Sequence, residues 1–198
     1  EGKERIADIA QIVRSLVPIA RFGFVAYRDR DDPEFLTRVQ PLTYSTGKLY
    51  RFLSTLEAKG GGDWFEAIDA GLKDAVEHSG WRLGARKIII VIGDAPMKES
   101  QLKTVIRIVE RFRRQGGTVS TLDVSDQANP HLLEAKVGRK VSRALYRAAP
   151  MHSFLVIGEA GMGDAATLDG EIKLTKRLIT LIMGDRFANE MQALLDIL

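Results

Sequence analysis

The chain has 198 residues, of which 45% are hydrophobic and 28% charged, a composition typical of one globular domain with a sizeable core. It has no cysteine, which excludes disulfides, thiol catalysis and cysteine-ligated zinc or iron–sulfur sites. The net charge of +3 does not by itself require nucleic acid or a membrane surface as a partner, and no apolar run approaches the roughly 20 residues of a membrane-spanning helix.

The first part of the chain predicts one helix and two strands. Apolar residues at helical spacing predict a helix over residues 3–17, so the beginning of the sequence does not resemble a signal peptide. The apolar run 21–27 predicts a buried strand, and a polar turn follows at 28–33. Residues 34–42 alternate in polarity and include a proline near their end, which favours an edge strand.

The following elements alternate between helices and strands. Helices are predicted over about 46–58 and 64–79, on either side of a run of three glycines. The stretch 87–96 holds five consecutive isoleucine and valine residues, which predict a central parallel strand buried on both faces. A helix around 102–112 and a strand at 118–124 follow. This order predicts a parallel sheet that is covered by helices on both sides.

Three aspartates are predicted near the edge where the parallel strands end, which is where open sheets of this kind bind ligands. Asp29 and Asp94 follow strands, and Asp63 precedes a helix. Three carboxylates in one place suit a hard divalent cation such as Mg²⁺. Each also has another interpretation: Asp63 and Glu66 match a capping box, Asp94 a turn former and Asp29 a solvated loop charge. The glycines before Asp63 favour a backbone pressed close to a site.

The stretches "FGFVAYRDRDD", "GGGDWFEAIDAGL" and "ARKIIIVIGDAP" resemble, in this order and spacing, the von Willebrand factor type A (VWA) domain, particularly its microbial-type branch. The resemblance covers about residues 3–124 and resumes at 158–185. It implies a doubly wound, Rossmann-like α/β fold with a mostly parallel sheet, one antiparallel edge strand and helices on both faces. It also implies that "FLVIG" at 154–158 is helical and that a short strand follows at about 165–168.

The resemblance further implies a metal-ion-dependent adhesion site (MIDAS) in which Asp63 and Asp94 bind Mg²⁺, Mn²⁺ or Ca²⁺. In the family, the ion completes its coordination with an acidic group of the partner protein. Trp64 is a candidate for partner contact, although a tryptophan in such a position more often packs. The residues expected to contact the partner are Asp29, Gly61, Gly62 and Trp64.

One part of the family pattern has no counterpart in the sequence, namely the D-x-S-x-S motif that follows the family's first strand. That strand lies between those predicted at 21–27 and 87–96. We therefore expect 1–198 to be a single VWA-like domain that is incomplete at its N-terminus, with further residues upstream in the native protein. Without that strand the sheet is expected to split or to leave two unpaired edges. Metal binding by this chain alone is expected to be weak or absent.

An inserted segment at about 127–150 is predicted to contain a basic amphipathic helix. Its basic face is either solvated or a contact for an acidic partner, nucleic acid or anionic lipid. The residues on that face are Lys136, Arg139, Lys140, Arg143 and Arg147.

The predicted function is that of a non-enzymatic protein-binding module. Two alternatives are a scaffold with a degenerate metal site that binds through its basic helix, and a magnesium-dependent hydrolase or phosphoryl-transfer enzyme. The enzyme would need a nucleophile or base beside the metal, and none is evident. The dinucleotide-binding fingerprint and the phosphate-binding loop are not met. The sequence does not specify a compartment; a soluble domain, extracytoplasmic or part of a larger protein, is compatible with it.

Overall fold

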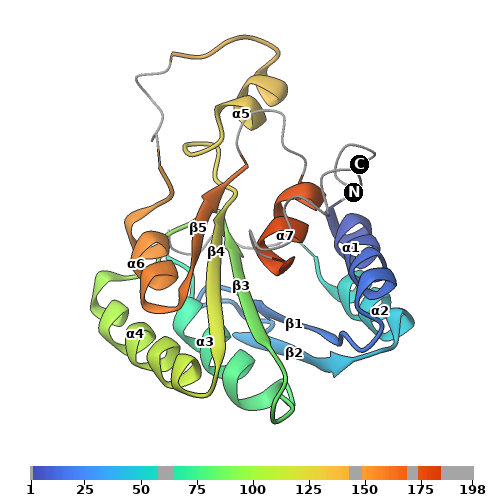
Figure 1. Ribbon diagram of the computed structural model, residues 1–198. Helices are drawn as coiled ribbons and strands as arrows, with labels where there is room; N and C mark the ends of the chain where they lie inside the picture. Colours follow the sequence, from blue (N-terminus) through green and yellow to red (C-terminus); the bar gives the residue numbers. More distant parts are fainter. Residues whose placement is uncertain (1, 58–64, 143–148, 169–173, 184–198) are drawn as a thin grey trace.

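A computed structural model of the protein describes residues 2–57, 65–142, 149–168 and 174–183 (Figure 1). Within them, five strands form two sheets. An antiparallel pair consists of β1 (Phe22–Tyr27) and β2 (Thr37–Thr43), and a parallel sheet consists of β3 (Lys87–Gly93), β4 (Gly117–Asp123) and β5 (Met162–Thr167), in that order. The helices are α1 (Gly2–Leu16), α2 (Thr46–Thr55), α3 (Ile68–His78), α4 (Glu99–Arg114), α5 (Pro130–Val137), α6 (His152–Ala160) and α7 (Leu174–Met183).

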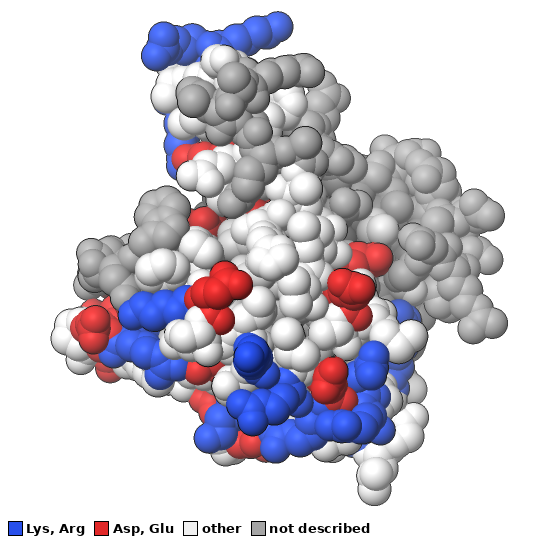
Figure 2. Space-filling view, turned by 90° about the vertical axis from the view of Figure 1, so that its left-hand side faces the viewer, with Lys and Arg blue, Asp and Glu red and all other residues white. Residues whose placement is uncertain are grey.

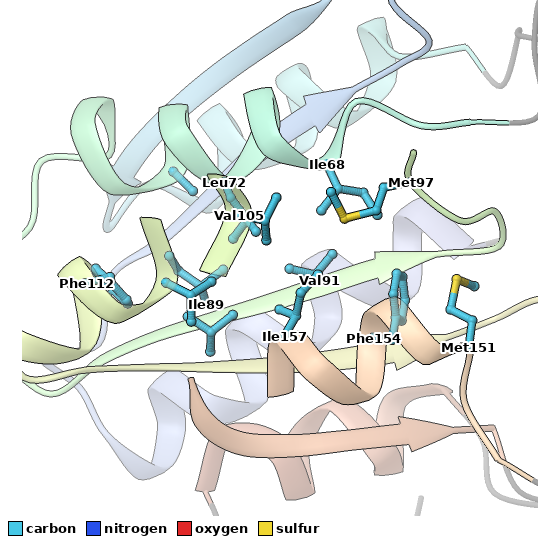
Figure 3. Packing of buried hydrophobic residues seen from close by; sticks show 13 residues of the cluster. Ile68, Leu72, Ile89, Val91, Met97, Val105, Phe112, Met151, Phe154 and Ile157 are labelled. Atoms are coloured by element: carbon cyan, nitrogen blue, oxygen red, sulfur yellow. The ribbon is translucent and has the colours of Figure 1, made fainter. Parts of the chain in front are cut away.

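Helices cover both faces of the parallel sheet, as the sequence predicts. Helices α3, α4 and α6 pack on one face, and α1 and α7 lie on the other (Figure 1). In the first layer, Phe112, Phe154 and Ile157 are fully buried and project from α4 and α6 against β3 and β4 (Figure 3). In the second, Ile9 and Val13 of α1 pack with buried apolar residues of β4, β5 and α7. Burial of apolar surface on both faces is the main stabilising contribution to this arrangement.

Several predicted elements are confirmed. The helix predicted over 3–17 is α1, the strand predicted at 21–27 is β1, and the helix predicted around 102–112 lies within α4. The "FLVIG" segment is helical and belongs to α6. Burial between α4 and the sheet accounts for Phe154 and Ile157 of α6, whereas Leu155 is 40% exposed. The run of four apolar residues therefore hides the helical periodicity, and periodicity alone does not distinguish this element from a strand.

The position of β3 differs from the prediction. The sequence predicts a central strand, but β3 lies at the edge of its sheet and pairs only with β4 among the described strands. The central strand is β4, in which Val119 and Leu122 are fully buried. The apolar run of β3 has another cause: its alternate residues face the two helical layers, Ile89 and Val91 toward one and Ile90 and Ile92 toward the other.

The predicted basic amphipathic helix is interrupted. Helix α5 ends at Val137, and Gly138 follows with a left-handed φ of 67°, a common way to end a helix. Lys136 lies in the last turn, where its Nζ pairs with Asp126 at 3.0 Å. Arg139 and Lys140 come after the helix, and Arg143 and Arg147 lie outside the described residues. The described part therefore does not form one continuous basic face.

Candidate functional site

A cavity of about 270 Å³ lies between the two sheets, where β1 and β3 end. It opens at the carboxyl end of β3, the position at which open α/β sheets bind ligands. Its walls combine apolar residues of the two strands with two carboxylates. The residues that line it are Val25, Ala26, Tyr27, Glu66, Ile92, Gly93 and Asp94.

Tyr27 connects the two sheets across this cavity. Its hydroxyl donates a hydrogen bond of 2.8 Å to the carbonyl oxygen of Ile92. The next carbonyl in β3, that of Gly93, accepts from Val124 on the β4 side. Because successive carbonyls of a strand point to opposite sides, the Ile92 carbonyl belongs to the edge that faces β1. The phenol therefore binds a backbone acceptor that a neighbouring strand would otherwise bind.

Two glycines make room for this side chain. A Cβ atom at Gly71 of α3 would lie 2.8 Å from Cδ1 of Tyr27, and one at Gly93 would lie 2.9 Å from its hydroxyl oxygen. Burial, together with the carboxylates of Glu66 and Asp94, raises the pKa of Tyr27 above its ordinary value of 10.0. The phenol is therefore a hydrogen-bond donor at neutral pH. Sequence reasoning missed Tyr27, because its partner Ile92 is 65 residues away.

The carboxylates of Glu66 and Asp94 share the cavity, and Asp94 is exposed at its rim. The backbone N–H of Glu66 donates to Pro96 O at 3.0 Å, which ties the segment before α3 to the turn after β3. Helix α3 begins at Ile68 with Ala67 as its N-cap, so the capping-box interpretation of Asp63 is wrong. Asp63 itself lies outside the described residues, as do Gly61, Gly62 and Trp64.

Asp29 lies just beyond β1, but it is only 7% exposed, so its interpretation as a solvated loop charge is wrong. Its neighbour Arg28 is also buried and organises the loop after β1. The Arg28 guanidinium pairs with Asp32 at 3.0 Å and with Glu34 at 3.1 Å. The pKa of Asp32 is lowered, mainly because its carboxylate accepts a hydrogen bond from the backbone N–H of Glu34. The hydrogen bond and the charge of Arg28 lower it further.

A second buried polar cluster follows β4. The Asp123 carboxylate is fully buried and accepts from the N–H and hydroxyl of Ser125 and from the N–H of Met151, at 2.6 to 2.9 Å. The Asn129 side chain donates to two carbonyls and accepts from the N–H of Leu168. These bonds fix both ends of the insertion between β4 and α6. The cluster is internally bonded and is structural, and its only signal in the sequence is an aspartate at a strand end.

The cavity offers part of a divalent cation site. Carboxylate oxygens are suitable donors, but Mg²⁺ requires six ligands in octahedral geometry. Within the described ranges, no group of three or more His, Asp or Glu side chains is arranged to hold a metal ion. Glu66 and Asp94 are two carboxylate ligands at the cavity, so a complete metal site needs further oxygen ligands from other residues. No helix in the described ranges has both the length and the apolar character to cross a membrane.

Comparison with known proteins identifies relatives of this fold. A family model described as "von Willebrand factor type A domain" matches residues 5–154, more than half of the chain. The alpha-protein kinase vwkA of Dictyostelium discoideum is 33% identical over 92 residues. That match covers 46% of this chain but only 14% of the kinase-named protein, so it carries no argument about the activity of the whole relative.

Solved structures with a similar fold include three proteins of different kinds. The SpRpn10 VWA domain is 14% identical, with a TM-score of 0.59 over 90% of this chain and 80% of that one. Proximal thread matrix protein 1 of the mussel byssus, with a zinc-occupied MIDAS motif, is 15% identical, with a TM-score of 0.58 over 91% of this chain and 39% of that one. An aerotolerance-related membrane protein of Bacteroides fragilis is 16% identical, with a TM-score of 0.56 over 91% and 88%. At these identities the likeness shows the fold alone.

Proposed function

Because the chain belongs to the von Willebrand factor type A domain family, whose members are typically non-enzymatic protein-interaction modules, we propose that it binds a partner protein through a divalent cation held at the carboxyl ends of β1 and β3. The observation that carries the proposal is the cavity between these strands, with Glu66 and Asp94 at its wall. The partner supplies a carboxylate that completes the coordination of the ion.

The remaining metal ligands come from a strand that inserts between β1 and β3 and ends in a D-x-S-x-S motif. Two features of the described structure support this step. Each of these strands is hydrogen-bonded to a neighbour on one side only, and the Ile92 carbonyl on the open side of β3 is satisfied by the phenol of Tyr27. Unpaired strand edges are sites at which another strand adds.

Asp63 joins Asp94 as a ligand in this proposal. It precedes Glu66 by three residues, and the backbone of Glu66 is bonded to Pro96 just beyond β3. Three residues of extended chain span at most roughly 11 Å, a length that supports the proposed position of Asp63 at the cavity. Gly61 and Gly62 let the backbone approach the ion and the partner, and Trp64 contacts the partner.

The cavity favours a binding role over phosphoryl transfer. A transferase or hydrolase needs a nucleophile or base beside the metal. Tyr27 is the hydroxyl-bearing residue among those that line the described cavity, and its raised pKa keeps it protonated at neutral pH. A protonated, hydrogen-bonded phenol is a poor nucleophile, so the ion serves to bind a carboxylate.

The proposal is tested with Mn²⁺ as the metal and a synthetic peptide as the inserting strand. The peptide has an apolar strand sequence followed by Asp-x-Ser-x-Ser, and the control peptide has Asn-x-Ala-x-Ala instead. Free Mn²⁺ is measured by electron paramagnetic resonance, and peptide docking is measured separately by fluorescence anisotropy. We expect both peptides to dock, and tight Mn²⁺ binding only with the first peptide.

The matched variant is Asp94→Asn, which removes one carboxylate at the exposed rim and leaves the strand intact. It should abolish Mn²⁺ binding without changing peptide docking. If the two peptides confer equal Mn²⁺ binding, or if Asp94→Asn behaves as the wild type, the metal site is not formed by these residues. If neither peptide docks, the strand-insertion step is wrong.

A further inference from the structure

The opposite end of the molecule, where the parallel strands begin, has a different character. It is formed by the loops 17–21, 44–45 and 79–86, which precede β1, follow β2 and precede β3; we call these loops the basic end. No Asp or Glu occurs in four of the stretches that run to this end of the fold, which are 9–22, 35–56, 78–93 and 111–122. The turn into β5, which also begins here, is flanked by Glu159 and Asp164. The acidic residues of the cavity lie at the other end of the strands.

Arginines join the three loops of the basic end. Arg82 donates to Ile19 O at 3.0 Å and to the hydroxyl of Tyr44 at 2.9 Å. Arg14, at the end of α1, donates to the carbonyl of Tyr44 and lies over its ring. The loops therefore form one surface.

Among the residues that the structure describes, no carboxylate neutralises the arginines of this surface. Across the described ranges, no ion pair involves any of the four arginines there, and each donates instead to a backbone carbonyl; they are Arg14, Arg21, Arg82 and Arg86. The last turn of α4 adds Arg113 and Arg114 at the same end. Figure 2 shows Lys and Arg gathered toward the lower end of the face that carries α4, with Asp and Glu side chains between them. Glu77, a nearby carboxylate on α3, is paired with Arg111.

Apolar side chains protrude between these cations. Leu83 is 99% exposed, Ile19 68% and Tyr44 46%. The loop that carries Leu83 is nevertheless anchored, because the indole N–H of Trp81 donates to Ala75 O at 2.9 Å and its ring packs on Phe112. The loop thus holds a leucine at its tip in full contact with water, where turn residues are usually polar.

We propose that the basic end docks on a bilayer surface that contains anionic phospholipid. Guanidinium groups bind lipid phosphates and are drawn to the negative potential of such a surface. Leu83 and Ile19 enter the boundary between headgroups and acyl chains, and Tyr44 lies at headgroup level, as aromatic residues do at membrane interfaces. Side chains that stand clear of the protein suit a soft, deformable surface better than a protein interface, whose anchors fill preformed pockets. Docking in this orientation leaves the cavity at the far end facing away from the membrane.

The test is sedimentation of the chain with vesicles of phosphatidylcholine, with and without phosphatidylserine. We expect binding only to the anionic vesicles, weakened by added salt and unaffected by a chelator. The double substitution Leu83→Ser with Ile19→Ser should reduce binding by about tenfold or more, since both side chains leave water on docking. Its control is Val137→Ser on α5. Val137 is as exposed as Tyr44, but it lies outside the basic end, so this variant should bind the vesicles as the wild type does.

The contribution of charge is tested by Arg86→Gln, which should weaken vesicle binding about fivefold. The control is Arg139→Gln in the insertion, which should leave vesicle binding unchanged. Thermal melts of each variant verify folding. Equal binding to neutral vesicles, or full retention by the Leu83 and Ile19 double variant, would overturn membrane docking. Concentration-dependent self-association at low salt, without vesicle binding, would show that the basic end meets the cavity carboxylates of a second copy, and would equally overturn membrane docking. Binding of an acidic polypeptide such as polyglutamate in place of vesicles would assign the surface to a protein partner.

Discussion

The substitution Tyr27→Phe tests the contact that joins the two sheets. It removes only the hydroxyl that donates to Ile92 O and leaves the ring between Gly71 and Gly93 in place. The packing of the ring is therefore retained, and the measured change reports the hydrogen bond. Tyr44→Phe is the control, because its hydroxyl accepts from Arg82 on an exposed surface.

The expected loss has two contributions. A buried hydrogen bond between neutral groups contributes about 1 kcal/mol to the free energy of unfolding, and a carbonyl left without its partner costs about 1–3 kcal/mol more when water cannot reach it. Ile92 is partly exposed, so water can replace part of the bond. We therefore expect a loss of about 1–2 kcal/mol, which lowers Tm by about 2–8 °C for a chain of this size. The control should change by less than about 0.5 kcal/mol.

The same variant makes a prediction about alkaline pH. The pKa of Tyr27 is raised in the folded chain, whereas the phenol of the unfolded chain ionises near 10.0. Above that pH the folded state holds a proton that the unfolded state has lost, so unfolding becomes more favourable as pH rises. The contribution of Tyr27 is complete below pH 10.0 and decreases above it, by up to about 1.4 kcal/mol per pH unit.

Urea unfolding at a series of pH values measures both effects. The wild type and Tyr44→Phe should lose stability above pH 10, and Tyr27→Phe should lose less. An unchanged free energy of unfolding at pH 7, together with an alkaline slope equal to that of the wild type, would refute the assignment of Tyr27 as the donor between β1 and β3.

Three further substitutions test the packing and the charges around the site. Asp123→Asn should lower the free energy of unfolding by about 2–4 kcal/mol in urea titrations, because an amide donor replaces an oxygen that accepts only N–H and O–H groups. Gly71→Ala should destabilise the chain by about 1 kcal/mol, since a Cβ 2.8 Å from the Tyr27 ring outweighs the gain in helix propensity. Gly47→Ala should instead raise Tm, because its Cβ would meet Ser45 Oγ at an ordinary contact distance of 3.8 Å. The lowered pKa of Asp32 stabilises the fold above its ordinary value of 3.8, a contribution lost as pH falls below that value; Asp32→Asn should therefore show a shallower acid transition by circular dichroism.

Part of the candidate site could be predicted from the sequence. Asp94 follows an apolar strand, and the rule that ligands bind at the carboxyl ends of parallel strands places it at the cavity. The assignments of Asp63, Gly61, Gly62 and Trp64 remain predictions, because these residues lie outside the described ranges. The sequence offers Glu66 only as part of a capping box, whereas its place in the cavity depends on a bond to Pro96, thirty positions along the chain.

The sequence by itself determined the elements whose signals are local. Apolar spacing determined α1 and α4, and the run of β-branched residues determined β3, because these patterns act within a few residues. Tertiary contacts decided that α3 begins at Ile68, that β3 lies at an edge, and that Tyr27 spans the two sheets. Each of these features depends on contacts between groups from distant parts of the chain. Those contacts stabilise it only once the helical layers have packed on the sheets.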